Sequence, residues 1–338
     1  MKKNVAVIGV GAVGVEIIKI LKERKFPINN LRVFARSRRS IEIEGEDYEV
    51  EAIEDSDFSN IDIALFAGTE GEKGASVLYA DKFVKKGAVV IDNGSDFRLK
   101  KNVPLIVPEI NKGEVIRHKG IIANPNCTTI QMVVALADIY RTFGLKEIIL
   151  SSYQATSGAG RKASLGLWEE TREVVENNKD KDFNCLAKKL SGPNRVFGPQ
   201  IAFNVIPRIG SPAEDGYTGE EWKVVRETHK IFNDRRIKIS ATCARVPVFT
   251  SHCESIHFTT KENASLSRIA GVLNNSAGVE YSGESLCFPL DAEGKDPVYV
   301  CRLRPNLYRK KSFWMWCVAD NLRKGAALNA VQIAELLL

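Results

Sequence analysis

An apolar run that leads into a glycine-rich turn constrains the fold of this chain most. Val5-Ala6-Val7-Ile8 has the length and composition of a buried parallel strand. It is followed by Gly9-Val10-Gly11-Ala12-Val13-Gly14, and then by apolar residues with helical spacing at Ile17, Ile18 and Leu21. A G-x-G-x-x-G motif between a strand and a helix is typical of a dinucleotide site, because its glycines let the backbone approach a pyrophosphate at the helix N-terminus. The alternative is a tight strand–helix turn without a ligand.

The residues after the second expected strand bear on the kind of dinucleotide. That strand, Leu31-Arg32-Val33-Phe34, runs into Ala35-Arg36-Ser37-Arg38-Arg39. An NAD site usually places Asp or Glu at this point, where it binds the ribose hydroxyls. Arg36 and Ser37 are instead hydrogen-bond donors suited to a 2′-phosphate, which favours NADP. A solvated basic loop is the alternative.

The rest of the first half alternates strands with helical segments. Residues 41–54 alternate in character around Gly45-Glu46-Asp47 and predict a hairpin. Core strands are expected over 61–66 and 88–91 with a helix over 75–85, and short extended runs over 104–109 and 120–123. This alternation predicts a Rossmann-type, doubly wound parallel sheet.

The second half has a different pattern. Residues 254–260 alternate as a half-exposed antiparallel strand would. Further strands are expected over 148–154, 203–207, 238–248 and 314–318, and helices over 165–178, 219–232 and 326–338. We therefore expect an α/β protein with a nucleotide-binding domain over 1–126, completed by the C-terminal helix 322–338. Residues 127–321 are expected to form a second, α+β domain of mostly antiparallel sheet.

Composition narrows the class of function. The chain has 338 residues, 44% hydrophobic and 27% charged, which is ordinary for a soluble globular protein. The net charge of +6 is mild and spread along the chain, so it suits anionic small molecules and does not predict nucleic-acid binding. Seven cysteines without C-x-x-C spacing predict neither a disulfide framework nor a metal site, and they favour a cytoplasmic setting. No apolar stretch is long enough for a membrane span.

A cysteine at an expected helix entry is the candidate nucleophile. Pro125-Asn126-Cys127 precedes an apolar run over residues 130–137 that predicts a buried helix. Asn126 is a good N-cap, so Cys127 lies in the first turn, where the helix dipole favours thiolate over thiol. A thiolate is the nucleophile that acyl transfer needs. An inert core cysteine is the alternative.

Several further motifs follow in order and carry a resemblance. They are Ser152-Tyr153-Gln154-Ala155-Thr156-Ser157-Gly158-Ala159-Gly160, Glu220-Glu221-Trp222-Lys223, Arg245-Val246-Pro247-Val248, His252 and Ala319-Asp320-Asn321-Leu322-Arg323-Lys324-Gly325-Ala326-Ala327. With Pro125-Asn126-Cys127, their joint spacing resembles the bacterial-type aspartate-β-semialdehyde dehydrogenases from about residue 3 to 338. The resemblance implies that 4-phospho-L-aspartate and NADPH interconvert with L-aspartate 4-semialdehyde, phosphate and NADP⁺, on the route to lysine, diaminopimelate, methionine and threonine. It also implies a homodimer or a homotetramer, with residues 127–321 as the catalytic and dimerisation domain.

The resemblance assigns the catalytic roles. Cys127 would attack the acyl phosphate, expel phosphate and leave a thioester, which hydride from NADPH converts to a thiohemiacetal that collapses to the aldehyde. His252 would be the general acid/base, for which the ordinary pKa of an imidazole is suited. Gln154 would position the substrate and Cys127, although a strand-end amide that bonds the backbone is the alternative.

The resemblance also assigns binding residues. Arg98, Asn126 and Lys223 would bind phosphate, Arg245 the substrate α-carboxylate and Glu220 its ammonium group. An exposed loop arginine is the alternative for Arg98, and a surface ion pair is the alternative for Glu220 and Lys223. The cofactor would contact Gly9, Gly11, Ala12, Val13, Gly14, Arg36, Ser37, Ser157, Gly158 and Asn321.

The chain departs from the family pattern at four places. The first glycine loop is shorter than G-x-x-G-x-x-G, and Ala67-Gly68-Thr69-Glu70 stands where serines are usual. Gly94-Ser95-Asp96 replaces Ser-Ser-Ala, and Ser251 rather than glycine precedes His252. Two other functions stay open at this point. One is a related N-acetyl-γ-glutamyl-phosphate reductase, which should lack the acid at Glu220, and the other is a catalytically silent binding or scaffold protein.

Overall fold

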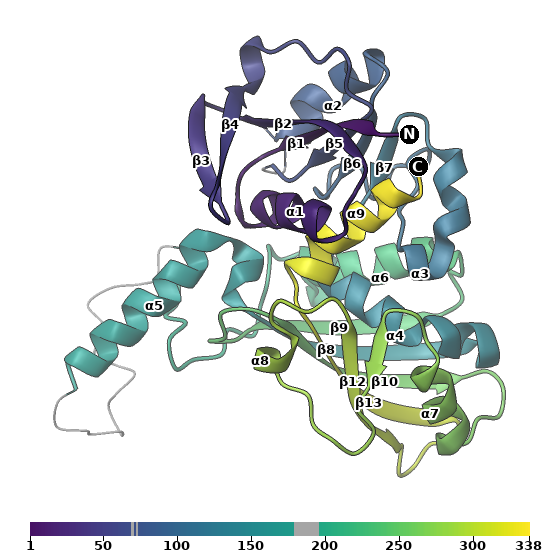
Figure 1. Cartoon of the computed structure of the whole chain (residues 1–338). Helices are drawn as coiled ribbons and strands as arrows, with labels where there is room; N and C mark the ends of the chain where they lie inside the picture. Colours follow the sequence, from purple (N-terminus) through teal and green to yellow (C-terminus); the bar gives the residue numbers. More distant parts are fainter. Residues whose placement is uncertain (69–70, 72–73, 179–195) are drawn as a thin grey trace. The chain divides into compact units, whose positions relative to one another are not determined.

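The computed structural model describes residues 1–68, 71, 74–178 and 196–338. The chain forms two compact units, which are described one at a time (Figure 1). Unit 1 comprises Met1–Ala137, Arg226–Arg235 and Leu322–Leu338, and unit 2 comprises Asp138–Val225 and Arg236–Asn321. Two helices, α4 (Cys127–Phe143) and α6 (Gly219–Phe232), contribute residues to both units.

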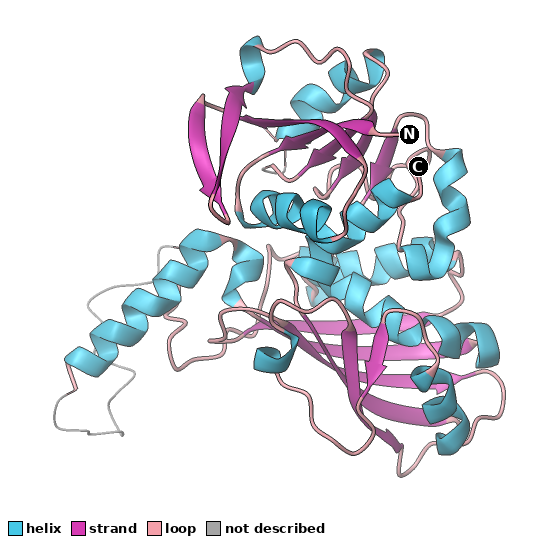
Figure 2. Ribbon diagram, viewed as in Figure 1, coloured by secondary structure: helices cyan, strands magenta, loops and turns pink. Residues whose placement is uncertain are grey.

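Unit 1 contains a seven-stranded sheet in the order β3-β4-β2-β1-β5-β6-β7 (Figure 2). Its strands are β1 (Lys3–Ile8), β2 (Ile28–Ala35), β3 (Arg39–Ile43), β4 (Glu46–Ala52), β5 (Ile63–Phe66), β6 (Val89–Asp92) and β7 (Ile121–Ala123). All neighbours pair in parallel except β3 and β4, which form the predicted hairpin. The hairpin turn lies at Glu44 and Gly45, both with positive φ, as a two-residue turn matched to strand twist requires.

Helices cover both faces of this sheet, which confirms the predicted doubly wound arrangement (Figure 1). They are α1 (Ala12–Glu23), α2 (Ala75–Lys85), α3 (Pro108–Asn111) and α9 (Leu328–Glu335), with 3₁₀ turns at Ile53–Asp55 and Lys112–Arg117 and a π turn at Arg323–Ala327. Strand alternation separates the two layers. Val33 and Leu65 share a core cluster with α1 and α9, whereas Phe34 and Phe66 contact Phe83 of α2 edge-on.

Unit 2 contains a six-stranded mixed sheet in the order β11-β12-β13-β10-β8-β9. Its strands are β8 (Leu145–Gln154), β9 (Lys238–Arg245), β10 (His252–Thr260), β11 (Val279–Tyr281), β12 (Val298–Pro305) and β13 (Ser312–Ala319). The three central pairings are antiparallel and the two outer pairings are parallel, so the predicted mostly antiparallel sheet is confirmed. Strand β10 is mostly buried rather than half-exposed, because it lies between β13 and β8.

The helices of this unit include α5 (Arg161–Glu176), α7 (Leu266–Asn274) and α8 (Pro289–Ala292), with 3₁₀ turns at Thr156–Ala159 and Glu214–Gly216. Helices α7 and α8 and strands β11 and β12 were not predicted from the sequence. Within the described part of the chain, no helix is both long and apolar enough to cross a bilayer.

Two predicted extended segments are wrong. Residues 203–207 do not form a strand, because Phe203 has a φ of 57° and only Ile206 pairs with Arg245 as a single bridge. In residues 104–109, Leu105 makes one bridge to Ala123 and then Pro108 begins α3. Proline suits a helix start because its missing N–H is not needed there.

Candidate active site

Unit 1 has a pocket of about 900 Å³ at the carboxyl end of its central strands. The expected cofactor residues Gly9, Gly11, Arg36 and Ser37 all line it. Ala12 and Val13 begin helix α1, and Gly14 follows in the same first turn. The pocket therefore lies where open α/β sheets bind nucleotides, at the strand end followed by a helix N-terminus.

The three motif glycines meet three different requirements. Gly9 has a φ of +100°, and a Cβ there would lie 2.7 Å from the Ala67 carbonyl oxygen. A Cβ on Gly14 would lie 1.8 Å from the Gly9 carbonyl oxygen, so the helix packs against the strand only without a side chain. A Cβ on Gly11 would meet no atom within 4 Å. Gly11 therefore borders open space, as a residue that lets a pyrophosphate approach the backbone should.

The basic loop contributes one residue that the sequence analysis did not assign. Arg39 lines the pocket with Arg36 and Ser37, and its Nη1 atom lies 3.2 Å from Ser37 Oγ. These donors fit the chemistry of a phosphate on the adenosine ribose. The run of basic residues could have indicated Arg39. Thr69 and Glu70, in the loop that departs from the family pattern, lie outside the described residues.

Cys127 is the first residue of helix α4 and is partly exposed. Asn126 caps this helix, as predicted, because its Oδ1 atom accepts a hydrogen bond of 3.2 Å from the Thr129 N–H. The Asn126 carbonyl accepts the first helical hydrogen bond, from the Ile130 N–H, at 2.9 Å. The thiol is thus held at the positive end of a capped, buried helix.

A buried carboxylate in the same unit joins Arg98 to the start of α4. Glu227, in α6, accepts a hydrogen bond from Arg98 Nη1 at 3.2 Å and from the Asn126 N–H at 2.7 Å. Arg98 is only 5% exposed, which excludes the exposed loop arginine. Its Nε and Nη2 atoms donate to the carbonyls of Asn124 and Asn93. No local pattern indicates Glu227, because its partners are distant in sequence.

Unit 2 gathers the other polar residues around the end of β8. Gln154 Nε2 donates to Glu220 Oε1 at 3.2 Å, and Lys223 Nζ lies 3.4 Å from Glu220 Oε2. Because Glu220 is buried, its pairing with Lys223 is not simply a surface ion pair. Arg245 Nη1 donates to the Ala155 carbonyl at 2.6 Å. The Glu220 carboxylate, the Lys223 ammonium group and the Arg245 guanidinium thus lie around the end of β8, where Gln154 is found.

The burial and hydrogen bonding of His252 could not be predicted from the sequence. It is fully buried, and this burial, with the nearby Arg245 charge, lowers the pKa of its imidazole to about 3. Its Nδ1 atom accepts a hydrogen bond of 3.1 Å from the Ala155 N–H, so the neutral ring carries its proton on Nε2. Nε2 has no hydrogen-bond partner among the described residues, and a Cβ on Gly158 would lie 3.0 Å from it. The ring is therefore a neutral donor, not the half-protonated imidazole that its ordinary pKa suggested.

The last two predicted cofactor residues also adjoin this histidine. Asn321 Oδ1 accepts hydrogen bonds of 3.0 Å from Ser157 Oγ and from the Ser251 N–H. Ser251, which replaces the expected glycine, has a φ of 71° and is buried. That value lies in the left-handed region, which explains why glycine suits this position. Asn321 therefore holds the segment before His252 in place.

The predicted residues thus form two sets, one in each unit. Unit 1 provides a thiol at a helix N-terminus, a buried arginine and a nucleotide-sized pocket. Unit 2 provides a neutral imidazole donor, a guanidinium and a carboxylate–ammonium pair. The thiol can add to a carbonyl, and the imidazole can donate a proton to the resulting oxygen. The charged groups can bind an anionic amino acid.

Comparisons with known proteins agree with this arrangement. A profile of the semialdehyde dehydrogenase NAD binding domain matches residues 4–118, and one of the semialdehyde dehydrogenase dimerisation domain matches residues 136–324. An aspartate-semialdehyde dehydrogenase of Aquifex aeolicus is 45% identical over 348 residues, covering 100% of this chain and 98% of the relative. That of Bacillus subtilis is 40% identical over 345 residues, covering 99% and 97%.

Solved structures match over the same length. The crystal structure of aspartate semialdehyde dehydrogenase II from Vibrio cholerae has a TM-score of 0.92 and 39% identity, covering 100% of this chain and 98% of that one. A structure of the same enzyme complexed with ASA matches equally well. The chain belongs to the aspartate-semialdehyde dehydrogenase family.

Proposed function

We propose that this protein catalyses the reversible, NADP-dependent reductive dephosphorylation of 4-phospho-L-aspartate to L-aspartate 4-semialdehyde. The observation that carries the proposal is Cys127 at the entry of a capped helix, in a chain of this family. The product lies on the route to lysine, diaminopimelate, methionine and threonine. The related Vibrio cholerae enzyme, whose structure is described as complexed with ASA, supports this substrate class.

Cys127 is the proposed nucleophile. Its sulfur attacks the acyl carbonyl, the bond from that carbon to the phosphate oxygen breaks, and a thioester forms. The helix N-terminus stabilises the thiolate before attack. When bound, NADPH supplies the hydride that converts a thioester to a thiohemiacetal. Sulfur is a fair leaving group, so collapse of the thiohemiacetal releases the aldehyde and restores the thiol.

His252 is the proposed proton donor. Its Nε2–H is directed by the backbone hydrogen bond to Nδ1 and is buried, so it can stabilise negative charge on the thiohemiacetal oxygen as a neutral imidazole. A substrate carboxylate bound to Arg245 would offset the guanidinium charge that helps to lower the pKa of His252. Substrate binding would then raise this pKa and make proton transfer to and from His252 easier.

The remaining polar residues are proposed to bind substrate. Arg245 binds the α-carboxylate, and Glu220 binds the ammonium group, with Gln154 hydrogen-bonded to Glu220 and so fixing its direction. Lys223, Arg98 and Asn126 are the proposed phosphate residues. Arg98 is held by Glu227 and two backbone carbonyls, which supports its role as a preorganised charge in unit 1.

The cofactor is proposed to be NADP in preference to NAD. Gly9, Gly11 and Gly14 fit a pyrophosphate at the start of α1, and Arg36, Ser37 and Arg39 lie in the same pocket. Ser157, Gly158 and Asn321, in unit 2, are proposed as further cofactor contacts. Arg36→Ala should raise the KM for NADP at least tenfold and that for NAD far less, because a phosphate is lost as partner. Arg38→Ala is the matched control, and an equal rise for both cofactors would contradict the assignment.

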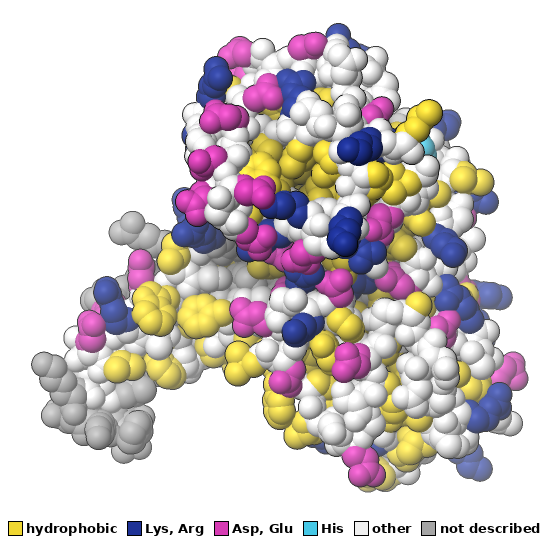
Figure 3. Space-filling view, in the orientation of Figure 1, with side chains coloured by type: hydrophobic (Ala, Val, Ile, Leu, Met, Phe, Trp, Pro, Cys, Tyr) yellow, Lys and Arg dark blue, Asp and Glu magenta, His cyan; other side chains and the backbone are white. Residues whose placement is uncertain are grey.

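Assembly, domain roles and location complete the proposal. We assign cofactor binding to residues 1–126 with 322–338, and catalysis and dimerisation to 127–321. Helix α5 exposes Trp168 (59%) and Val175 (60%), and Figure 3 shows hydrophobic side chains gathered on and beside this helix. Such a surface supports a homodimer or homotetramer. A cytoplasmic location is proposed because the cysteines have neither disulfide nor metal spacing in the sequence, as is usual in a reducing compartment.

The decisive assay is reduction of NADP⁺ by L-aspartate 4-semialdehyde, which should depend on phosphate. The same assay with N-acetyl-L-glutamate 5-semialdehyde tests the related reductase, and Glu220→Gln should impair only the reaction of the substrate with a free ammonium group. No phosphate-dependent reduction of NADP⁺ with either aldehyde would leave the binding or scaffold function as the better account.

A further inference from the structure

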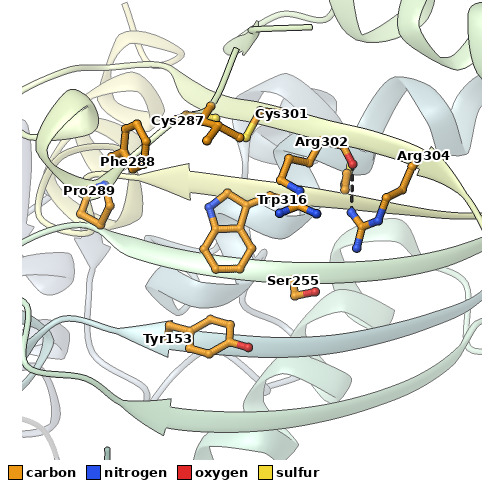
Figure 4. Close-up of a pocket in the computed structure, with 11 residues that line it drawn as sticks. Tyr153, Ser255, Cys287, Phe288, Pro289, Cys301, Arg302, Arg304 and Trp316 are labelled. Carbon is orange, nitrogen blue, oxygen red and sulfur yellow. Dashed lines mark hydrogen bonds between the residues drawn. The ribbon is translucent and has the colours of Figure 1, made fainter. Parts of the chain in front are cut away.

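A pocket in unit 2 and a lysine in unit 1 lie outside the residues proposed above. The pocket, of about 320 Å³, contains the aromatic side chains of Tyr153, Phe288 and Trp316 (Figure 4). Such side chains are common where two protein chains meet, so this pocket fits the dimerisation already proposed for residues 127–321. The lysine is Lys230 of helix α6, which donates hydrogen bonds to three carbonyls of a single turn.

That turn follows β6 and carries Arg98, one of the proposed phosphate residues. Residues 93–104 contain neither helix nor strand. The N–H groups of Arg98, Lys100 and Val103 each donate to the carbonyl three residues earlier, at 3.3, 3.1 and 3.2 Å. These distances exceed the usual length of such a bond, about 2.9–3.0 Å. The turn's own hydrogen bonds therefore hold Arg98 only weakly, and its position depends on contacts from elsewhere in unit 1.

Lys230 supplies the strongest of these contacts to the backbone. Its Nζ atom lies 2.6 Å from the Arg98 carbonyl oxygen, 2.9 Å from that of Lys100 and 2.7 Å from that of Val103. An ammonium group has three N–H donors and no acceptor, so each carbonyl can take one donor. The Val103 carbonyl accepts no other hydrogen bond within the described part of the chain. Because hydrogen bonds from a charged donor are the stronger kind, Lys230 anchors the turn.

Helix α6 binds Arg98 at both its ends. Glu227, three residues before Lys230, accepts a hydrogen bond from Arg98 Nη1 at 3.2 Å and another from the Asn126 N–H at 2.7 Å. Residues three apart are neighbours on the surface of a helix. Glu227 therefore fixes the guanidinium of Arg98, and Lys230 fixes the backbone from which that side chain begins.

We propose that Lys230 is a positioning residue for phosphate and acts through Arg98. This inference rests on the proposed function, in which Arg98 binds the phosphate that leaves the acyl carbon or, in the reverse direction, attacks the thioester. Lys230 directs its three donors to carbonyls, so it holds the turn and does not bind phosphate itself. A charge that is held in place before its ligand arrives needs no reorganisation on binding. Loss of Lys230 therefore weakens phosphate binding without removing a reacting group.

The test measures reduction of NADP⁺ by L-aspartate 4-semialdehyde over a range of inorganic phosphate concentrations. Lys230→Met keeps the apolar stem and removes all three donors, so the KM for phosphate should rise about tenfold. The kcat at saturating phosphate and the KM for the aldehyde should change less than about twofold, whereas general damage to the fold would move all three. Lys230→Gln, whose amide has two N–H donors, should give a smaller rise.

Lys101→Met is the matched control, because Lys101 is an exposed lysine of the same turn. It should leave the KM for phosphate unchanged. A rise in Lys230→Met no larger than in this control would overturn the proposal. So would equal changes in kcat and in every KM. If circular dichroism shows that Lys230→Met does not fold, the comparison of Lys230→Gln with the control decides the outcome.

A double-mutant cycle tests whether Lys230 acts through Arg98. Arg98→Lys keeps the charge beside Glu227 but loses the fork of donors, so it should raise the KM for phosphate. Adding Lys230→Met should then raise this KM by less than about threefold, because the positioned guanidinium is already absent. A further rise as large as in the wild-type background, or no effect of Arg98→Lys alone, would overturn the proposal.

The same assay separates this inference from the proposed function. A wild-type protein that reduces NADP⁺ without need of phosphate would overturn the proposed function, and this inference with it. Phosphate-dependent activity in the wild type with an unchanged KM for phosphate in both Lys230 variants would overturn this inference alone.

Discussion

Lowering the pH from about 7.5 to about 5 should destabilise unit 2 through one side chain, His252. Its pKa is about 3 in the folded protein and 6.5 for an ordinary imidazole, because the charged ring would be buried beside Arg245. Between these values the unfolded chain binds a proton that the folded protein does not. The stability from this group is thus complete above pH 6.5 and is lost as the pH falls toward 3. At pH 5 the loss is about 2 kcal/mol, at about 1.4 kcal/mol per pH unit.

Tryptophan fluorescence can measure the pH-dependent loss of stability in unit 2 alone. All four, Trp168, Trp222, Trp314 and Trp316, belong to unit 2, so their fluorescence reports urea unfolding of that unit. His252→Gln should remove about 2 kcal/mol of the pH dependence between pH 7.5 and 5. Burial also lowers the pKa of His257, so His257→Gln is the matched control that keeps the contribution of His252. Parallel curves for wild type and His252→Gln over this range would refute the reasoning.

Three further substitutions test the candidate site. Cys127→Ala should abolish turnover in the coupled NADP⁺ assay while circular dichroism stays unchanged, and a substantial residual rate would refute covalent catalysis. Ser251→Gly should raise the free energy of unfolding by about 1 kcal/mol in urea titrations, because it relieves a left-handed backbone, and a loss of stability would show that the serine is held for another reason. Gly158→Ala should lower kcat at least tenfold and stability by about 1–3 kcal/mol, since its methyl group would lie 3.0 Å from His252 Nε2. Gly271→Ala, in open space on α7, is the control: it should leave kcat unchanged and should raise stability rather than lower it, because alanine favours a helix interior over glycine.

Local signals predicted much of the fold. The bounds of α2 and α6 agree with the helical spacing of their apolar residues, and the predicted cap at Asn126 accepts the expected hydrogen bond from the Thr129 N–H. The glycine motif was informative because Gly9 and Gly14 each face a backbone carbonyl that leaves no room for a Cβ, whereas Gly11 borders open space. Hydrophobic periodicity and capping act over a few residues, so they can be recognised without knowledge of tertiary contacts.

Features set by distant contacts could not be predicted in the same way. Residues 203–207 are apolar enough for a strand, but the left-handed backbone at Phe203 turns the chain before a ladder can form. The lowered pKa of His252 depends on burial and on Arg245, which only the folded sheet brings near. Short elements such as β11 and α8 have too few residues for a periodic pattern.

Glu227 illustrates what such a distant contact means for anyone who redesigns this protein. One of its oxygens accepts a hydrogen bond from Arg98 and the other from the backbone N–H of Asn126, so the proposed phosphate residue and the residue before the proposed nucleophile share a single anchor. If Arg98 binds the leaving group as proposed, directed evolution that moves Arg98 for a bulkier leaving group would also disturb the backbone next to Cys127. Libraries that vary Arg98, Asn126 and Glu227 together should therefore yield active enzymes that libraries at single positions miss.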